Sequence, residues 1–325
     1  MINVDNLSKK GRDNNALLSV VIPVYQEGDH IKSSINVIEK VIAKHHPNYE
    51  FVLVDDGSKD NTWCELKSLA NENARVSLIR LSRNFGKESA LCAGLEHAKG
   101  DMVLVMDADL QHPPNLIPEM INSWLEGYDV VEGIKRSRGK ENIFYSLCAR
   151  FFYYLIYKSS DINLGQASDY KLLDRKVVEA WKELPERAIF FRGMSAWLGF
   201  DRKEIEFDVA ERVNGKTKWS LFRLVRLALN AITSYTSVPL HCITLLGAIM
   251  FIVAVILGIE TLFMKLSGRA SDGFTTVILL QLIIGSSIMT SLGIIGIYLA
   301  KIYKEVKSRP RYIISDYIRG GDHRC

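Results

Sequence analysis

Two long uncharged stretches near the end of the chain restrict its fold more than any other feature. Residues 242–259 and 274–300 hold no charged side chain, and they lie within the apolar segments Val238–Met264 and Phe274–Ala300. A helix needs about 20 apolar residues to cross a bilayer. The alternative is a buried hairpin in a soluble core, but a soluble fold rarely needs two such helices in succession. We therefore predict two transmembrane helices.

Lysine and arginine residues flank these two segments and are scarce between them. They are Lys216, Lys218, Arg223 and Arg226 before the first segment, and Lys301, Lys304, Lys307, Arg309 and Arg311 after the second. The intervening loop holds only Lys265 and Arg269, which are opposed by Asp272. The positive-inside rule therefore predicts that both ends of the chain lie in the cytoplasm.

The composition narrows the setting of the protein. The 325 residues carry a net charge of only +4, so nothing calls for a nucleic acid partner. The five cysteines are scattered without a CxxC pair, which argues against a disulfide framework or zinc site and favours a reducing compartment. The first fifteen residues are polar, so we predict no cleaved signal peptide.

Strand-like and helix-like segments alternate before the apolar region. The predicted strands are 18–24, 51–54, 76–81, 102–106 and 129–134, and the predicted helices are 29–43, 62–70, 88–98 and 116–125. Strands recur roughly every 25–30 residues, the length of a βαβ unit. This rhythm predicts an α/β domain with a mostly parallel sheet and helices on both faces.

Two further segments combine aromatic and basic side chains. Residues 143–157 and 219–235 are both predicted helices of this kind. They could pack on the sheet, or they could lie at a membrane surface, where aromatic and basic residues are favoured together. We favour the membrane surface because the second segment runs directly into the first apolar stretch.

Two acids follow the predicted strand 102–106. Asp107 and Asp109 are spaced so that both side chains lie on the same side of an extended chain. They could belong to a plain polar loop. However, ligands bind at the carboxyl ends of strands in an open α/β sheet, and paired carboxylates suit Mg²⁺ or Mn²⁺ together with substrate phosphates. Gln111 could add a third oxygen ligand or contact a sugar.

A second acid pair, Asp55 and Asp56, follows the strand at 51–54. A sharp turn explains Gly57, and a helix cap explains Ser58, without any ligand. Such a turn does not explain two adjacent acids. A carboxylate at this position could accept hydrogen bonds from a base or a ribose hydroxyl.

Aromatic and basic residues follow the first and third strands. Tyr25 could be a core aromatic or could stack on a nucleobase. Arg83 and Lys87 could belong to a plain basic loop. Because they precede a predicted helix, they also suit a diphosphate, which two cations and a helix N-terminus would bind.

Together these motifs resemble glycosyltransferase family 2 in their order and spacing. They are Pro23-Val24-Tyr25, Val54-Asp55-Asp56-Gly57-Ser58, Arg83-Asn84-Phe85-Gly86-Lys87 and Asp107-Ala108-Asp109-Leu110-Gln111. With the paired C-terminal spans, the chain is similar over nearly its whole length to the polyprenyl-phosphate glycosyltransferases. That subgroup includes bactoprenol glucosyltransferases and relatives of dolichol-phosphate mannose synthase.

The resemblance implies a GT-A nucleotide-diphospho-sugar transferase domain. It assigns a divalent metal to Asp107 and Asp109, with Gln111 nearby, and gives Asp109 a catalytic role through that metal. It also implies donor binding by one group of residues and acceptor-phosphate binding by another. The donor group is Pro23, Tyr25, Glu27, Asp55, Asp56, Arg83, Lys87, Asp107 and Gln111, and the acceptor group is Arg192, Arg212, Lys216 and Lys218. The acceptor residues also fit a juxtamembrane basic patch attracted to anionic lipid.

Residues 168–175 are similar to the family segment G-D-F-R-L-x-D/S-R, which makes Asp169 a catalytic candidate. Ser168, Tyr170 and Lys171 depart from that pattern, and Lys171 stands where the family has arginine. A phosphate monoester, with a second pKa of about 6, is already largely ionised at neutral pH. We therefore rank assembly of the two anions by cations above proton removal by Asp169.

The resemblance implies a membrane-bound inverting enzyme that moves glucose from UDP-glucose onto undecaprenyl or another polyprenyl phosphate. The reaction would occur on the cytoplasmic face of a bacterial inner membrane, for cell-envelope glycan modification, and the enzyme would be a homo-oligomer in contact with membrane lipids. One rival is a processive polysaccharide synthase, but no glutamine begins a Q-x-x-R-W segment. The other is a non-catalytic nucleotide-sensing scaffold, which would not need all these motifs together.

These interpretations divide the chain into five parts. Residues 1–16 form an N-terminal tail, and 17–215 form the GT-A domain. An amphipathic juxtamembrane helix covers 216–236, two transmembrane helices cover 237–303, and a basic cytoplasmic tail covers 304–325.

Overall fold

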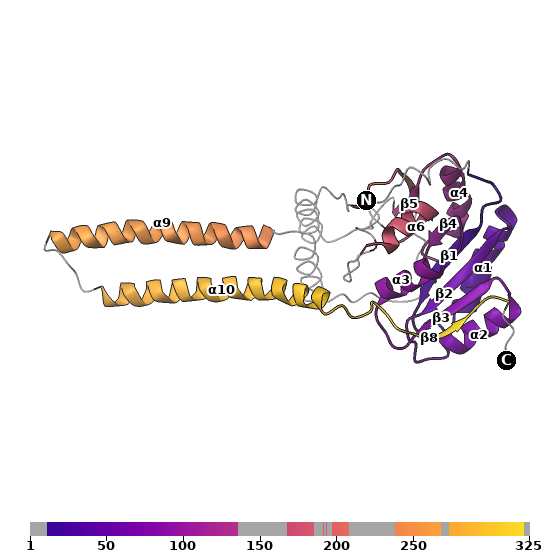
Figure 1. The fold of residues 1–325 in the computed structure, drawn as a ribbon, viewed down its shortest axis with the longest axis horizontal. Coiled ribbons are helices and arrows are strands. Elements are labelled where there is room, and N and C mark those ends of the chain that lie inside the picture. The colour runs from indigo at the N-terminus through magenta and orange to yellow at the C-terminus, as the bar shows by residue number, and fades with distance from the viewer. Residues whose placement is uncertain are drawn as a thin grey trace. The chain divides into compact units, whose positions relative to one another are not determined.

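The computed structural model describes residues 12–135, 168–184, 191, 193, 197–207, 238–267 and 273–321. They belong to two compact units (Figure 1). The first is an α/β unit that also includes the chain after residue 308, and the second contains two long helices.

A mixed sheet forms the centre of the α/β unit, with the strand order β7-β5-β6-β4-β1-β2-β3-β8. The strands are β1 (Leu18–Val24), β2 (Tyr49–Asp55), β3 (Val76–Leu81), β4 (Met102–Val105), β5 (Val130–Lys135), β6 (Lys171–Asp174), β7 (Arg202–Phe207) and β8 (Ile314–Ile318). Within this sheet, β6 and β8 run antiparallel to their neighbours, while the other pairings are parallel. The expected mostly parallel α/β sheet is therefore confirmed.

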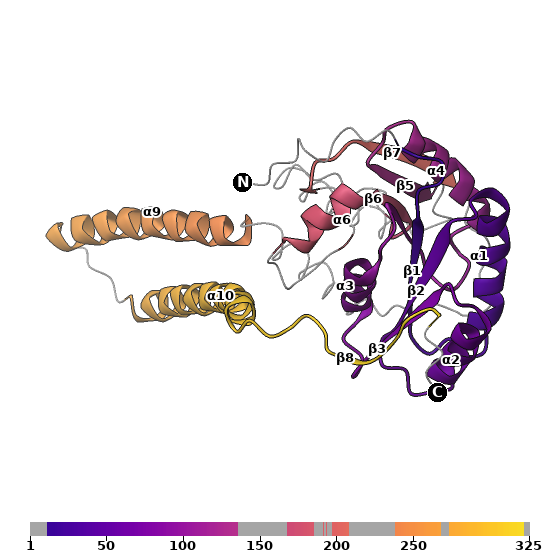
Figure 2. The same cartoon turned by 45° about the vertical axis from the view of Figure 1, so that its right-hand side comes forward.

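Helices cover both faces of the sheet (Figure 2). One face packs against α1 (Ile31–His45), α2 (Thr62–Glu72) and α4 (Ile117–Leu125), which follows the 3₁₀ turn η2 (Pro114–Leu116). The other packs against α3 (Lys87–His97) and α6 (Arg175–Lys182). Apolar strands buried on both faces are typical of sheets with helices on each side.

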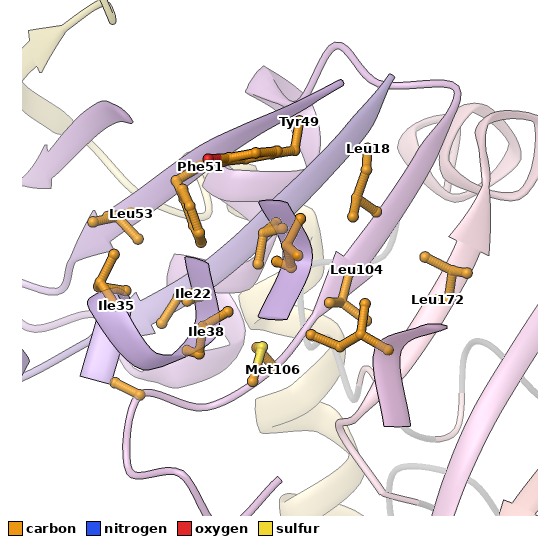
Figure 3. Packing of buried hydrophobic residues seen from close by; sticks show 14 of the residues in the cluster. Leu18, Ile22, Ile35, Ile38, Tyr49, Phe51, Leu53, Leu104, Met106 and Leu172 are labelled. Atoms are coloured by element: carbon orange, nitrogen blue, oxygen red, sulfur yellow. The ribbon is translucent and has the colours of Figure 1, made fainter. Parts of the chain in front are cut away.

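The core follows from the alternation of side chains along each strand (Figure 3). Leu18 and Ile22 of β1 contribute to the cluster under α1, while Val21 contributes to the cluster under α3. In α1, Ile35 and Ile38 lie three residues apart and are fully buried on that helix's inner stripe. Fully burying each such side chain contributes about 1.5–3 kcal/mol.

Helix α3 approaches the sheet very closely at Gly94. A Cβ atom added there would lie 2.3 Å from Cγ1 of Val21, which is far inside van der Waals contact. The close approach matters because the first residue of α3, Lys87, belongs to the candidate site. Gly94 thus helps to fix the distance of Lys87 from the strand ends.

All five predicted strands and all four predicted helices before residue 135 are present, with bounds shifted by a few residues. Strands β6, β7 and β8 were not predicted from the sequence. These strands are only 4–6 residues long, and β7 and β8 carry several charged or polar side chains. Such segments lack a clear apolar pattern of their own.

The last strand changes the interpretation of the C-terminal segment. Residues 304–325, expected to be a basic cytoplasmic tail, include β8, which pairs with the edge strand β3. The chain before β8 is also anchored: Arg311 donates to the carbonyl of Leu184, and the Tyr312 hydroxyl donates to Glu96. The part of this segment from Arg309 onward therefore belongs to the α/β unit.

The end of the predicted N-terminal tail is anchored as well. The guanidinium of Arg12 donates to the carbonyl of Tyr128 at 2.6 Å and pairs with Asp129 at 2.6 Å and with Asp174 at 3.3 Å. The described part of the tail, from Arg12 onward, is thus packed on the domain.

The second unit contains α9 (Val238–Leu266) and α10 (Phe274–Val306). Pro239–Met264 and Leu280–Val306 are long and apolar enough to cross a membrane. The most apolar part of each segment has no buried residue. This exposure argues against the buried hairpin and agrees with two transmembrane helices. The predicted aromatic helices at 143–157 and 219–235 lie outside the described residues.

Candidate active site

The carboxyl ends of β1, β2 and β4 meet at one edge of the sheet because these strands are parallel. The strand order reverses between β1 and β4, and such a switch point is where open α/β sheets bind ligands. A cavity of about 280 Å³ opens there. It is lined by Pro23, Val24, Tyr25, Glu27, Asp56, Asn84, Gly86, Lys87, Asp107, Ala108 and Asp109.

The turn after β4 presents Asp107 and Asp109 to this cavity. The Gln111 N–H donates to Oδ1 of Asp109 at 3.1 Å, which closes the turn. Leu110 has a φ of +58°, a left-handed conformation that costs a non-glycine residue about 1–3 kcal/mol and is found most often at functional sites. The turn is therefore held in one shape, with both acids toward the cavity.

His112 supports the same turn, and the sequence analysis assigned it no role. Its Nδ1 accepts a hydrogen bond from the Asp107 N–H at 3.1 Å, and its ring stacks on Tyr170 with centroids 4.8 Å apart. Burial lowers the pKa of His112, although Asp107 acts in the opposite direction. A neutral ring keeps Nδ1 available as an acceptor. The sequence signal that could have pointed to His112 is its position three residues after Asp109, in the loop that follows β4.

Lys87, at the start of α3, joins two acids from different strands. Its Nζ lies 2.6 Å from Oδ1 of Asp107 and 2.7 Å from Oδ2 of Asp169. Asp169 reaches this edge because β6 is antiparallel to β4, with Lys171 opposite Val105. Burial opposes the Lys87 charge, but the two carboxylates outweigh it and raise the pKa of Lys87. The site thus contains a carboxylate–ammonium–carboxylate bridge.

Asp55 and Asp56, at the end of β2, accept hydrogen bonds from backbone N–H groups of neighbouring loops. Asp56 accepts from the N–H groups of Phe85 at 2.7 Å and of Gly86 at 2.9 Å, and so fixes the loop before α3. Burial raises the pKa of Asp56, while these two hydrogen bonds oppose the rise. Asp55 is fully buried, accepts from the Ser58 N–H at 2.9 Å, and lies 3.3 Å from Nε of Arg80.

Gly57 lets the β2 loop approach the loop after β3. Its φ is +68°, and a Cβ there would lie 2.4 Å from the carbonyl carbon of Arg83. Both the backbone conformation and the close contact require glycine. The turn expected from the sequence at this position is therefore present.

Two hydrogen bonds attach the β1 loop to the β2 loop and to the start of α2. The Gln26 N–H donates to the Ser58 hydroxyl, and the Glu27 N–H donates to the Thr62 hydroxyl, both at 3.0 Å. This holds Tyr25, which is 41% exposed, at the cavity wall, where a planar ring could stack on it. Burial and then Asp109 raise the pKa of Glu27, because negative charge accumulates on this side.

Comparison with known proteins decides the family. The sequence model of the family described as "Glycosyl transferase family 2" matches residues 19–181. An uncharacterised glycosyltransferase of Synechocystis sp., sll0501, is 38% identical over 92% of this chain and 95% of its own.

The chain belongs to glycosyl transferase family 2.

Two other relatives align with this glycosyltransferase over nearly its whole length. An uncharacterised glycosyltransferase of Bacillus subtilis, YkcC, is 36% identical over 91% of this chain and 92% of its own. The bactoprenol glucosyl transferase of Shigella phage SfII is 35% identical over 93% of this chain and 99% of its own. The expected enzyme class and GT-A-like α/β fold are therefore confirmed, and the matching regions extend beyond the family domain.

Most of the predicted donor residues come together in this family 2 glycosyltransferase. Those that line the cavity are Pro23, Tyr25, Glu27, Asp56, Lys87 and Asp107, and the predicted metal ligand Asp109 lines it with them. Asp55, Arg83 and Gln111 do not line it. Asp55 is buried in its turn, and Arg83 is exposed with its guanidinium 4.1 Å from the Phe85 ring. Asp55 therefore shapes the turn after β2, and its donor contact stays a prediction.

The predicted acceptor residues Arg192, Arg212, Lys216 and Lys218 lie outside the described residues. The structure does describe Phe191, whose N–H donates to Oε2 of Glu88 at 2.9 Å. Glu88 follows Lys87 in the first turn of α3. The same helix start therefore contacts the acid bridge and the segment that leads into the predicted acceptor site.

The side chains at the cavity fit a hard divalent cation. Within the described parts of the chain, no three His, Cys, Asp or Glu side chains gather around one point. Asp107 and Asp109 supply two carboxylates beside open space, and the Glu27 carboxylate near them already responds to the negative charge. Mg²⁺ is commonly held in this way, by one or two carboxylates together with substrate phosphates.

Proposed function

We propose that this glycosyltransferase moves a hexose, glucose from UDP-glucose, onto undecaprenyl or another polyprenyl phosphate at the cytoplasmic face of a bacterial inner membrane. The observation that carries the proposal is the bridge of Asp107, Lys87 and Asp169 at the cavity, in a chain that also has two apolar helices. The bactoprenol glucosyl transferase of Shigella phage SfII, which aligns over almost the whole chain, supports the acceptor and the sugar.

The donor would lie across the end of β1. Tyr25 would stack on the base, and Pro23 and Glu27 would line the rest of the nucleoside site. Lys87 and the first turn of α3 would face the diphosphate, since a cation and a helix N-terminus both favour negative charge. In this pose the sugar is directed toward Asp169.

Mg²⁺ or Mn²⁺ would be held by Asp107 and Asp109, with Gln111 close by. When bound, the metal neutralises charge on the departing diphosphate. The remaining work belongs to the protein. His112 holds the Asp107 backbone, and the turn at Leu110 directs both acids into the cavity.

Two anions must meet for the transfer to occur, and cations reduce their repulsion. Lys87 already offsets part of the negative charge of Asp107 and Asp169. Arg192, Arg212, Lys216 and Lys218 would contribute charge from the acceptor side. Since the acceptor phosphate is mostly ionised at neutral pH, Asp169 would orient the sugar or the incoming phosphate and would not need to remove a proton.

The apolar helices give this chemistry a location. A polyprenyl chain remains in the bilayer, so the active site must stay within reach of the lipid headgroups. Two helices of transmembrane length, covalently joined to the α/β unit, would keep the enzyme at the membrane. The basic residues at both outer ends favour a cytoplasmic catalytic domain.

The proposal is tested by incubating membranes that contain the protein with a panel of radiolabelled nucleotide sugars. Each assay is run with Mg²⁺, with Mn²⁺ and with a chelator. We expect label from UDP-glucose to enter an organic-soluble lipid in a metal-dependent way, and we expect transfer by Asp107→Asn membranes to fall by about 10³-fold. Label that enters a polymer, or a lipid labelled only from another sugar, would contradict the proposal.

A further inference from the structure

A second charged pair lies fully buried behind the acid bridge. Lys171 of β6 and Glu132 of β5 are 0% and 2% exposed, and Nζ of Lys171 lies 3.1 Å from Oε1 of Glu132. Burying two charges costs several kcal/mol for each ion, and their attraction often only offsets that cost. A well-packed apolar pair would stabilise the core at least equally. Stability alone therefore does not explain the pair.

The position of the pair relates it to the active site. Asp169 lies two residues before Lys171, the first residue of β6, on the segment that enters the strand. They attract one another, and Asp169 also bonds to Lys87. The charges thus alternate in sign from Asp107 through Lys87, Asp169 and Lys171 to Glu132.

Glu132 also fixes the backbone next to Asp169. The same Oε1 atom that meets Lys171 accepts a hydrogen bond from the Ser168 N–H at 3.0 Å. On the other side, the Tyr170 carbonyl accepts from the Gly133 N–H at 2.9 Å, and the Tyr170 N–H donates to the Ser168 hydroxyl at 3.1 Å. Both neighbours of Asp169 are therefore attached to β5 or to each other.

Lys171 also contacts the aromatic ring of Phe191. Its Nζ lies 5.8 Å from the ring centre of Phe191, within the range of a cation–π interaction. Phe191 is the residue whose N–H is held by Glu88. The buried ammonium therefore interacts with both Asp169 and Phe191.

We propose that Lys171 and Glu132 are positioning residues for the transfer reaction, which hold the Asp169 carboxylate in its productive orientation and place a second cation beside it. The inference rests on the proposed role of Asp169 in sugar transfer. Lys171 does not need to touch either substrate. Its charge acts through Asp169, and Glu132 compensates that charge and orders residues 168–170.

The test compares three forms of the full-length protein. The first, which we call the neutral pair, combines Lys171→Met with Glu132→Gln; it removes both charges, roughly keeps the side-chain volumes and leaves an acceptor for the Ser168 N–H. The second is Lys171→Arg, which retains the charge. The third is a control, Lys203→Met with Glu126→Gln. It removes an exposed ion pair, with Nζ of Lys203 2.7 Å from Oε2 of Glu126, whose residues do not line the cavity.

For the neutral pair we expect kcat for transfer to the lipid to fall about tenfold or more, with KM for the nucleotide sugar within about twofold and Tm within about 3 °C of the unmodified protein. Lys171→Arg should restore kcat to within about threefold, and the control pair should leave it unchanged. A purely structural role would lower Tm and would not reduce kcat selectively.

A neutral pair that folds and transfers sugar at the unmodified rate would overturn the inference. If the neutral pair does not fold, Lys171→Arg decides alone: a tenfold loss of kcat at an unchanged Tm would contradict a role that depends on charge. If the unmodified protein transfers no sugar from any nucleotide donor, the proposed function fails instead. UDP binding, measured in parallel, distinguishes these two failures.

Discussion

Two acid pairs, Asp55 with Asp56 and Asp107 with Asp109, follow the ends of β2 and β4, and their surroundings differ. Asp55 and Asp56 are buried, and their oxygens meet the protein's own N–H groups and Arg80. Asp107 and Asp109 lie at the open cavity, where the Asp107 carboxylate pairs with Lys87 and Oδ1 of Asp109 accepts from the Gln111 N–H. Asp55 is thus enclosed in its turn, and Asp56 holds the loop before α3 while also lining the cavity. Asp107 and Asp109, at the same edge of the sheet, are left more open to the cavity.

The largest effect should come from the β4 pair. Asp107→Asn or Asp109→Asn should reduce kcat/KM for sugar transfer by about 10³-fold, because each change removes a charged ligand for the metal. Tm should stay within about 2 °C, since neither carboxylate is buried. The comparison fails if the activity survives or if these variants unfold.

Changes at Asp56, in the acid pair after β2, should lower the thermal stability of the protein. Asp56→Ala would leave the Phe85 and Gly86 N–H groups without their acceptor, at a cost of about 1–3 kcal/mol each. We expect a fall in Tm of roughly 5–10 °C, measured by thermal unfolding in detergent. Asp56→Asn, which keeps one acceptor oxygen, should lose about half as much. An unchanged Tm for Asp56→Ala would show that the loop does not depend on this carboxylate.

Lys87 should affect binding more than stability. Lys87→Met removes the ammonium between Asp107 and Asp169 and the charge that would face the diphosphate. Charge-assisted hydrogen bonds contribute about 1.5–3 kcal/mol, so kcat/KM should fall by about 30-fold. Lys87→Arg should recover part of the activity. Full activity in Lys87→Met would remove the bridge from the mechanism.

The smallest effect concerns Glu27. Its pKa is raised from the usual 4.5 by burial and by Asp109, so its charge destabilises the folded state at neutral pH. A raised carboxyl pKa contributes stability at low pH that is lost as the pH rises through the folded-state pKa. Glu27→Gln should therefore raise Tm slightly at pH 7, by about 1–2 °C, and not at pH 4. Equal gains at both pH values would contradict this cause.

The sequence predicted the part of the site that follows from local pattern. Strand ends such as Val24 and Val105 were visible as apolar runs, and parallel strands bring their following loops together. The three short strands β6, β7 and β8 were not visible, because pairing with distant segments, and not local periodicity, makes them strands. The antiparallel course of β6, which brings Asp169 to Lys87, was therefore beyond a sequence reading.

The sequence also did not separate the two acid pairs. Asp55 looked as suitable for a ligand as Asp107, because both follow buried strands. Only the folded loops show that Ser58 and Arg80 approach Asp55, whereas Asp107 faces the cavity. His112 was missed for a similar reason, since its contact with the Asp107 backbone depends on the shape of the turn.

The most direct test of the central claim is Mn²⁺ binding in the presence of UDP, measured by electron paramagnetic resonance on the full-length protein in detergent. We predict one bound Mn²⁺ in the unmodified protein, none in Asp107→Asn with Asp109→Asn, and one in Asp55→Asn. Mn²⁺ that remains bound after the β4 acids are changed, or that is lost with Asp55 alone, would contradict the account.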